Sequence, residues 1–281
     1  MQIFRTVREM QAWSLGRRAE GRRIALVPTM GALHEGHLAL IDAAKKQADE
    51  VVLSIYVNPT QFGPQEDFDK YPRTFDRDSD LAEQRGVAAI FAPSNEEMYP
   101  AGHQTFVTVT ELSRGLCGAF RPGHFRGVTT VVAKLFLIVQ PQRAFFGEKD
   151  YQQLKVIQRM VADLNIPVEV IGVETVRDPD GLAMSSRNAY LSPEERSEAL
   201  AISRSIALAQ DLVKQGTHDC KNILDQVQGL LFQGKFTMVQ YAEIVDEEML
   251  APLAAVERPA RLILAVYING KRLIDNGPLR P

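Results

Sequence analysis

Residues 23–40 read RIALVPTMGALHEGHLAL, and this stretch decides the fold class. Residues 23–27 form a short apolar run that Pro28 closes, as expected of a buried strand. A turn with two glycines follows, and residues 37–47 then place Leu38, Ile41 and Ala44 at helical intervals. A buried strand that leads through a turn into a helix predicts the first crossover of a parallel sheet.

The same alternation continues to about residue 175. Apolar runs predict further strands over residues 50–57, 87–91, 143–146 and 168–173, and helical patterns cover residues 76–85, 127–139 and 151–164. We therefore expect an α/β fold with a Rossmann-like, doubly wound parallel sheet. Ligands of such sheets bind at the carboxyl ends of the strands.

The pattern changes after the turn residues 178–181, which read DPDG. Ser192, Pro193 and Glu195 form a helix start, and two helices are expected over residues 194–214 and 220–232. A strand is expected over residues 241–245, and the Asn269-Gly270 pair between two apolar runs predicts a hairpin of residues 262–268 and 271–275. We expect a catalytic domain of residues 1–175 and a smaller α+β domain of residues 176–281, which acts as a lid.

The composition is that of a packed globular protein. Of 281 residues, 45% are hydrophobic and 24% charged, and the net charge of −3 argues against a nucleic-acid partner. Cys117 and Cys220 lie far apart without metal-site spacing, and two reduced thiols are the favoured interpretation over one long-range disulfide. The first residues lack the apolar core of a signal peptide, and no run approaches the ~18 apolar residues of a membrane span. We expect a soluble cytoplasmic protein with no membrane partner.

The turn between the first strand and its helix carries a histidine motif, His34-Glu35-Gly36-His37. A helix that begins near His37 would direct free N–H groups and its positive dipole end toward a phosphate. Two imidazoles at this point would stabilise the charge that develops on a phosphoryl group.

Two other interpretations of the motif remain. His-x-x-His spacing also occurs in metal sites, but no second Cys/His cluster completes a set of four ligands here. The histidines could also be solvated residues of an ordinary turn, although the two glycines at a strand–helix junction weigh against this.

A second polar motif, Ala183-Met184-Ser185-Ser186-Arg187-Asn188, lies next to the expected domain boundary. Its hydroxyl groups can donate to phosphate oxygens, and its guanidinium can bind a phosphate bidentately. By itself such a polar loop is mostly turn chemistry. The loop indicates a phosphate-binding site only in combination with the histidine motif.

The two motifs together resemble those of the nucleotidyltransferase superfamily. Four further segments narrow the resemblance to the pantothenate synthetase family: VNPTQF at 57–62, YPRT at 71–74, RPGHFRGV at 121–128 and FGEKDYQQ at 146–153. Residues 273–276, LIDN, extend the resemblance thinly toward the end of the chain. The resemblance implies an ATP-dependent ligase that joins (R)-pantoate and β-alanine through a pantoyl adenylate and releases AMP and pyrophosphate.

The resemblance also implies the roles of individual residues. The catalytic set is His34, His37, Lys149, Ser185, Ser186 and Arg187, with His37 as the proton donor. The ATP-binding set is Met30, Gly31, Ala32, Leu33, His34, Glu35, Gly36, His37, Gly147, Glu148, Lys149, Asp150, Val176, Met184, Ser185, Ser186 and Arg187. Gln61 and Gln153 hold pantoate, and Gln61 also borders β-alanine.

Three residues are weaker candidates for the same site, namely Asn58, Arg121 and His124; the last two are alternatively part of a basic surface loop. Asp78 is a candidate neighbour of Mg²⁺, but it lies in an acidic stretch with Asp67, Asp69, Asp76 and Asp80 that an ordinary solvated surface also explains. Since Mg²⁺ in such sites sits largely on substrate phosphates and water, Mg²⁺ with ATP as co-substrate needs no protein cage. The family also implies a homodimer.

Three other functions compete with this one. A plain nucleotidyltransferase would leave a nucleotide on a phosphate-bearing substrate, and a nucleotide-binding regulator would not turn over. A truncated aminoacyl-tRNA synthetase fits less well, because the slightly acidic chain has no room for an anticodon module.

Overall fold

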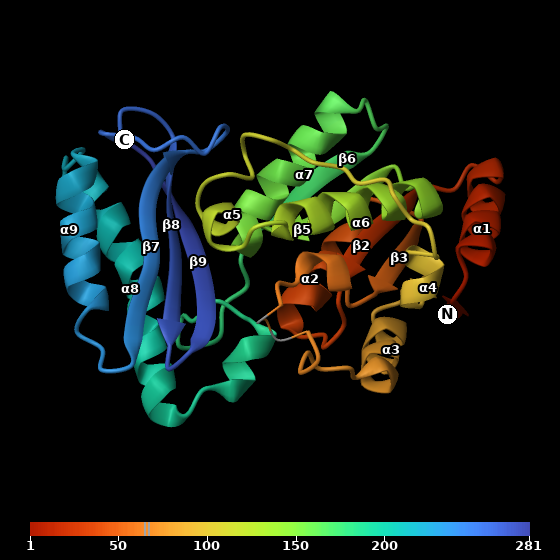
Figure 1. Cartoon of the computed structure of the whole chain (residues 1–281), viewed down its shortest axis with the longest axis horizontal. Helices are drawn as coiled ribbons and strands as arrows, with labels where there is room; N and C mark the ends of the chain where they lie inside the picture. Colours follow the sequence, from red (N-terminus) through yellow and green to blue (C-terminus); the bar gives the residue numbers. More distant parts are fainter. Residues whose placement is uncertain (65, 67) are drawn as a thin grey trace. The chain divides into compact units, whose positions relative to one another are not determined.

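The computed structural model describes residues 1–64, 66 and 68–281. The described chain packs into two compact units, one of residues 1–148 and 153–174 and the other of residues 149–152 and 175–281. Each unit contains its own sheet (Figure 1). The short segment 149–152 thus packs with the C-terminal part of the chain. The expected boundary after residue 175 and the role of a lid stay predictions.

The first unit is built on a six-stranded parallel sheet with the strand order β1-β4-β3-β2-β5-β6. Its strands are β1 (Gln2–Phe4), β2 (Ile24–Thr29), β3 (Glu50–Ile55), β4 (Ala89–Phe91), β5 (Arg143–Gly147) and β6 (Glu169–Val173). From β2 the chain first moves outward to β3 and β4, and later returns to the other side of β2 for β5 and β6. The order therefore reverses between β2 and β5, which is where a doubly wound sheet binds its ligands.

Helices cover both faces of this sheet. They are α1 (Val7–Ala19), α2 (Glu35–Lys45), α3 (Phe75–Gln84), α4 (Asn95–Met98), α5 (Cys117–Phe120), α6 (His124–Val139) and α7 (Tyr151–Asp163). One core lies beneath α2 and α3, where Leu38 and Ile41 pack against alternate residues of the central strands such as Val27 and Leu53. Helices α1, α6 and α7 lie over the opposite face (Figure 1). Because both faces are covered, the strands are apolar at nearly every position.

The doubly wound α/β class is confirmed, and the differences are local. β2 continues through Pro28 to Thr29, because β5 pairs only with Ala25 and Leu26 and leaves this end of β2 paired with β3 alone. α1 was not predicted, although Thr6 and Glu9 form a capping box at its start. α2 begins at Glu35, two residues earlier than expected, since the His34 side chain caps it.

The second unit is the expected smaller α+β part. Its antiparallel sheet has the order β7-β8-β9, with β7 (Thr237–Asp246), β8 (Ala260–Ile268) and β9 (Lys271–Leu279), and it packs against α8 (Pro193–Lys214) and α9 (Cys220–Leu231). Asn269 and Gly270 both adopt positive φ angles, 47° and 79°, as a two-residue turn between strands requires. Within the described residues, no helix is long and apolar enough to cross a membrane.

Candidate active site

The turn after β2 has a hydrogen-bond acceptor for each of four consecutive backbone N–H groups. Gly31 N donates to Thr29 Oγ1 at 3.2 Å, and Ala32 N and Leu33 N donate to the two carboxylate oxygens of Asp78 at 2.8 Å each. His34 N donates to His37 Nδ1 at 3.4 Å. Gly31 has a φ of 82°, and a Cβ there would lie 3.0 Å from Asp78 Oδ2, so this turn needs glycine.

The two histidines cap α2 reciprocally. His34 is the N-cap residue, and its Nδ1 accepts from Gly36 N at 3.2 Å while His37 Nδ1 accepts from His34 N. The ring centroids lie 4.1 Å apart. A nitrogen that accepts from N–H carries no proton, so a neutral imidazole in either position has its proton on Nε2. Both rings therefore offer Nε2–H as a donor beside the N-terminus of a helix, a position that favours anions.

Gln61 lies at the end of a short 3₁₀ turn, η1 (Pro59–Gln61), and its amide group is oriented by two neighbours. Its Oε1 accepts from Asn58 Nδ2 at 3.1 Å, and its Nε2 lies 3.2 Å from the sulfur of Met30. Asn58 is buried and also donates to the carbonyl of Gly127. A Cβ on Gly127 would lie 2.3 Å from the carbonyl oxygen of Thr60, so only glycine lets α6 pack this closely against η1.

Arg121 and His124 hold the backbone of Gln61 from the other side. His124 Nδ1 lies 2.8 Å and Arg121 Nη2 3.3 Å from the Gln61 carbonyl oxygen. His124 is buried, and Arg121 forms an ion pair with Glu66. Burial opposes ionisation of Glu66, but its hydrogen bonds to Arg121 and the charge of that guanidinium outweigh this and lower its pKa. The alternative of a basic surface loop is therefore wrong.

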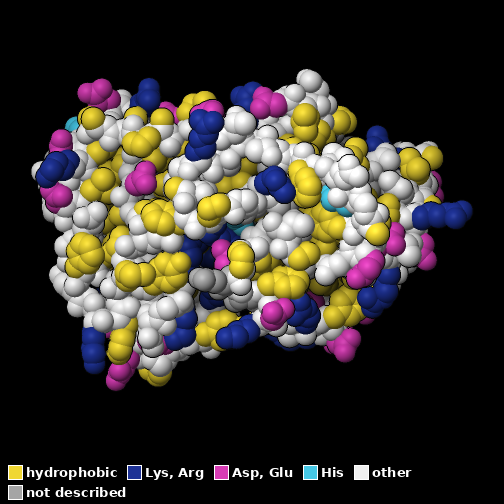
Figure 2. Space-filling model, viewed as in Figure 1, with side chains coloured by type: hydrophobic (Ala, Val, Ile, Leu, Met, Phe, Trp, Pro, Cys, Tyr) yellow, Lys and Arg dark blue, Asp and Glu magenta, His cyan; other side chains and the backbone are white. Residues whose placement is uncertain are grey.

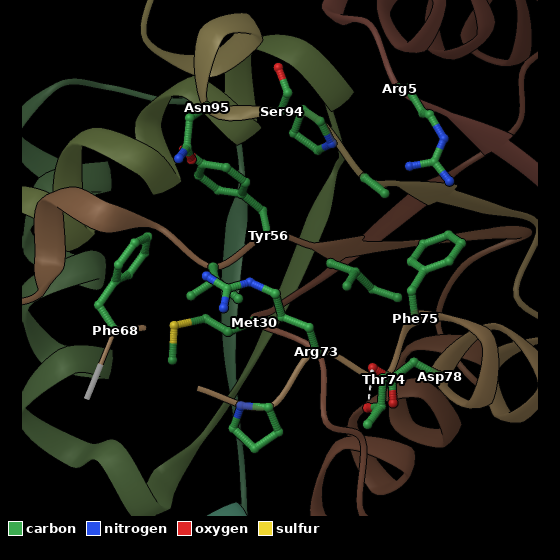
Figure 3. A pocket seen from close by; sticks show the side chains of 16 residues that line it. Arg5, Met30, Tyr56, Phe68, Arg73, Thr74, Phe75, Asp78, Ser94 and Asn95 are labelled. Carbon is green, nitrogen blue, oxygen red and sulfur yellow. Dashed lines mark hydrogen bonds between the residues drawn. The ribbon is translucent and has the colours of Figure 1, made fainter. Parts of the chain in front are cut away.

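A cavity of about 310 Å³ opens at the carboxyl ends of β2, β3 and β4. Met30, Tyr56 and Asn95, which follow these strands, line it (Figure 3). Arg5 and Arg73 also line it, and each guanidinium stacks on a phenylalanine ring. The cavity borders the histidine turn through Met30 and Gly31, on the side where Thr74 donates to Asp78 (Figure 3).

The second unit contains Lys149, Val176 and the loop of residues 184–187, which are further phosphate-binding candidates. Val176 and Met184 are joined by a backbone hydrogen bond of 3.0 Å, which closes the turn between them. Ser185 caps the short η3 turn (Ser186–Tyr190), where its Oγ accepts from Arg187 N at 3.3 Å. Lys149, from η2 (Glu148–Asp150), lines one small recess together with Ser185 and Asn188. Lys149 and Ser185, candidates from two distant parts of the sequence, therefore lie together.

Some predicted residues do not take part in these clusters. The Glu35 carboxylate pairs with Arg85 on the surface, and Asp150 is exposed. In the first unit, Gly147 ends β5, Glu148 lies against Gly172, and Gln153 lies half-buried in the first turn of α7.

The acidic stretch of residues 67–80 is only partly an ordinary solvated surface. Asp69, Asp76 and Asp80 are exposed, but Asp78 is fully buried and accepts three hydrogen bonds. Asp67 lies outside the described residues. Among the residues that are described, no group of three or more His, Cys, Asp or Glu side chains could hold a metal ion. On the face shown in Figure 2, acidic and basic side chains are interspersed.

Several residues that shape these sites were not predicted from the sequence to have a role. Thr74 and Tyr99 bond to Asp78 and Asn58, and Arg177 pairs with Asp275 of β9. Asp275 and its neighbour Asn276 belong to the LIDN segment at residues 273–276, where the resemblance to the family is thin. Buried polar residues within an apolar strand are the signal that could have revealed them.

A histidine–glycine turn at the carboxyl end of a central parallel strand, next to the reversal of strand order, is the arrangement of an α/β phosphate-binding enzyme. Residues 2–278 match the family described as pantoate-beta-alanine ligase, and the chain belongs to this family. It is an enzyme, a ligase that joins pantoate and β-alanine to form pantothenate.

Individual relatives match this chain over nearly their full lengths. The pantothenate synthetase of Syntrophus aciditrophicus is 53% identical over 98% of this chain and 96% of its own. The crystal structure of pantothenate synthetase from Thermus thermophilus covers 100% of both chains with a TM-score of 0.94 and 47% identity. The ligase of Francisella tularensis, complexed with beta-gamma ATP and beta-alanine, matches 99% of this chain and 97% of its own, with a TM-score of 0.81 and 33% identity.

Proposed function

We propose that the chain performs its ligation in two steps and uses ATP to activate pantoate. In the first step, a carboxylate oxygen of (R)-pantoate bonds to the α-phosphorus of ATP, and the bond from that phosphorus to pyrophosphate breaks. In the second step, the amine of β-alanine attacks the acyl carbon of the pantoyl adenylate. The bond from this carbon to the AMP oxygen breaks and the amine loses a proton, which leaves pantothenate and AMP.

The geometry of the histidine turn is the observation that carries this proposal. Thr29, Asp78 and His37 accept from the backbone N–H groups of residues 31–34 and hold the turn, while His34 and His37 keep Nε2–H as donors. Such fixed donors stabilise charge that develops on a phosphoryl group and need no reorganisation during the reaction. We assign both imidazoles to the ATP phosphates and His37 to the proton donated there. The likeness to the ATP-bound ligase of Francisella tularensis supports this assignment.

The other predicted residues take roles that suit their surroundings. We assign the Gln61 and Gln153 amides to pantoate, with Gln61 also beside β-alanine; Asn58, Arg121 and His124 hold Gln61. Lys149 supplies a charge to the phosphates, and Ser185, Ser186 and Arg187 supply hydroxyl and guanidinium donors. Since no protein nucleophile is involved, these residues contribute position and charge neutralisation.

We propose that ATP binds as its magnesium complex, with the ion held mainly by phosphate oxygens and water. The surroundings of Asp78 fit this assignment, because its carboxylate oxygens already accept from two backbone amides and the Thr74 hydroxyl. Mg²⁺ in such sites keeps several waters and takes few protein ligands.

The test is a substrate-omission assay that follows AMP and pyrophosphate. Pyrophosphate exchange into ATP should require pantoate alone, and net AMP release should require pantoate and β-alanine together. Release of AMP without either acid or amine would contradict the proposal. Transfer of a nucleotide onto a phosphate-bearing acceptor would identify a plain nucleotidyltransferase, and ATP binding without turnover would identify a regulator.

We also propose that the protein is a cytoplasmic homodimer whose ligands are small molecules. The net charge of −3 suits small substrates better than a nucleic acid. Cys117 and Cys220 carry thiols and form no disulfide, which suits a reducing compartment. Light scattering should give a mass twice the 31.3 kDa of one chain. A mass of one chain would contradict the dimer.

A further inference from the structure

β9 carries two adjacent polar residues that are almost completely buried. Asp275 is 2% and Asn276 4% exposed, within a strand that otherwise packs through leucine side chains. Because neighbouring residues of a strand point to opposite faces, each of the two reaches a different part of the second unit. A buried polar group is costly unless it is hydrogen-bonded, so the partners of this pair carry information about its role.

Asp275 holds the turn that contains Val176 and Met184. Its carboxylate binds the guanidinium of Arg177 bidentately, with N–O distances of 2.6 and 3.1 Å. Arg177 also donates to the carbonyl of Gly181 at 3.1 Å. Val176 and Met184 pair through their backbones directly beside this arginine. Asp275 thus fixes the base of the turn that leads into Ser185, Ser186 and Arg187.

Asn276 holds the backbone of Lys149. Its Nδ2 donates to the Lys149 carbonyl oxygen at 3.0 Å, while its Oδ1 accepts from Arg261 Nη1 at 2.6 Å. Arg261 is 6% exposed and lies 3.8 Å above the ring of Tyr151. The Tyr151 hydroxyl in turn donates to the Glu247 carbonyl at 3.1 Å. Asn276 cannot rotate its amide without losing one of these two bonds.

We propose that Asp275 and Asn276 are positioning residues that hold two separate phosphate-binding segments in one fixed frame. Lys149 and Ser185 line the same recess as Asp275, and the two adjacent β9 residues bond to the segments that carry them. Neither residue is assigned a contact with a reactant. Their effect is to fix where the Lys149 ammonium and the Ser185 hydroxyl meet the phosphates. The inference rests on the proposed function.

The test measures pantoate-dependent pyrophosphate–ATP exchange in Asn276→Asp. This variant keeps the side-chain shape and the acceptor for Arg261 but replaces the donor to Lys149 with an oxygen. We expect the KM for ATP to rise and kcat to fall, together by roughly 10–100-fold, since misplacement by about 1 Å costs this much. The KM for β-alanine in the complete reaction should stay within about twofold, because Lys149 lies on the phosphate side of the site.

Asp275→Asn should have the same selective effect, because it removes the charge that holds Arg177. Arg272→Gln is the matched control on the same strand: it removes bonds to Gln240 and Tyr241 and leaves Lys149 and Arg177 untouched. Equal losses in all three variants, or equal rises in the KM of every substrate, would show a merely structural role and overturn the proposal. An unchanged KM for ATP in Asn276→Asp would also overturn it.

If Asn276→Asp does not fold, Asn276→Ser replaces it, and the same outcomes apply. Failure of the proposed function is recognised separately, since the unmodified protein would then show no pantoate-dependent exchange.

Discussion

The Oδ1 atom of Asp78 lies 2.8 Å from the backbone nitrogen of Leu33, 45 residues earlier in the chain. The other carboxylate oxygen accepts from Ala32 N at the same distance. Ala32 has a φ of 50°, a conformation that costs a non-glycine residue about 1 kcal/mol or more unless its surroundings hold it. A buried carboxylate on α3 therefore fixes the turn that presents His34 and His37.

Replacing Asp78 should separate this structural role from a role in metal binding. Asp78→Ala leaves two backbone N–H groups unpaired in a buried place, and we expect a loss of about 2–4 kcal/mol in the free energy of unfolding. Asp78→Asn should raise the KM for ATP about tenfold or more, since the turn is displaced. Urea unfolding and pyrophosphate exchange measure the two effects.

The control for Asp78 is Asp76→Asn on the same helix. Asp76 is exposed, so this change should stay within about 0.5 kcal/mol. A titration with Mg²⁺ completes the test. If Asp78→Asn bound ATP normally at high Mg²⁺ but lost it at low Mg²⁺, Asp78 would be a metal ligand and its role as a brace would be refuted.

His34 has a capping role that can be separated from its chemistry. Asparagine is as good an N-cap as any residue, so His34→Asn should leave the free energy of unfolding within about 1 kcal/mol of the unmodified protein. It removes the Nε2–H donor, however, and adenylation should fall about 100-fold or more. His34→Ala, the comparison variant, should lose both stability and activity. Near-normal exchange in His34→Asn would exclude the imidazole from the reaction.

Much of the fold was predictable because local patterns and the sheet agree. The alternation of apolar runs and helical periodicity predicted the parallel sheet, and Asn269-Gly270 predicted the hairpin. The bounds of α2 were missed because histidine is not a usual N-cap; the reciprocal bonds of His34 and His37 replace the usual capping box. Sequence position also could not show that residues 149–152 pack with the C-terminal unit, since that depends on partners more than 90 residues away.

The candidate site was predictable only where its residues form motifs. The histidine turn and the loop of residues 183–188 stand out because several polar types and glycines occur together. The sequence indicated Asp78 only as a candidate neighbour of Mg²⁺, since it is one of several aspartates and only tertiary structure separates it from its exposed neighbours. The same holds for Asn276, whose donor reaches a carbonyl 127 residues away. Long-range bonds to backbone atoms leave little trace in a single sequence.

The close packing of α6 against η1 predicts opposite outcomes for two glycine substitutions. Gly127→Ala places a Cβ 2.3 Å from the Thr60 carbonyl oxygen, so the η1 turn must move. We expect a loss of about 1–3 kcal/mol in stability and weaker binding of pantoate, since Gln61 moves with the turn. Gly16→Ala on α1 meets no atom within 4 Å and should stabilise the protein by about 0.5–1 kcal/mol. Urea unfolding measures the free energy of unfolding of both variants. Equal changes in the two variants would contradict the close packing of α6 against η1.

The carboxylate of Glu195, in the first turn of α8, makes the stability of the protein depend on pH in the acid range. The Lys271 ammonium, the Ser192 N–H and the Asn269 amide all donate to Glu195, and lower its pKa from 4.5 to about 2. A lowered pKa in the folded state means that the ionised carboxylate stabilises the fold above about pH 4.5 and that this contribution is lost as the pH falls toward 2. Glu195→Gln should therefore lower the melting temperature at pH 7 and make it less sensitive to pH between 4.5 and 2. Glu194→Gln, an exposed neighbour without these partners, is the control. If the melting temperatures of the unmodified protein and of Glu195→Gln changed by the same amount between pH 4.5 and 2, Glu195 would have no such role.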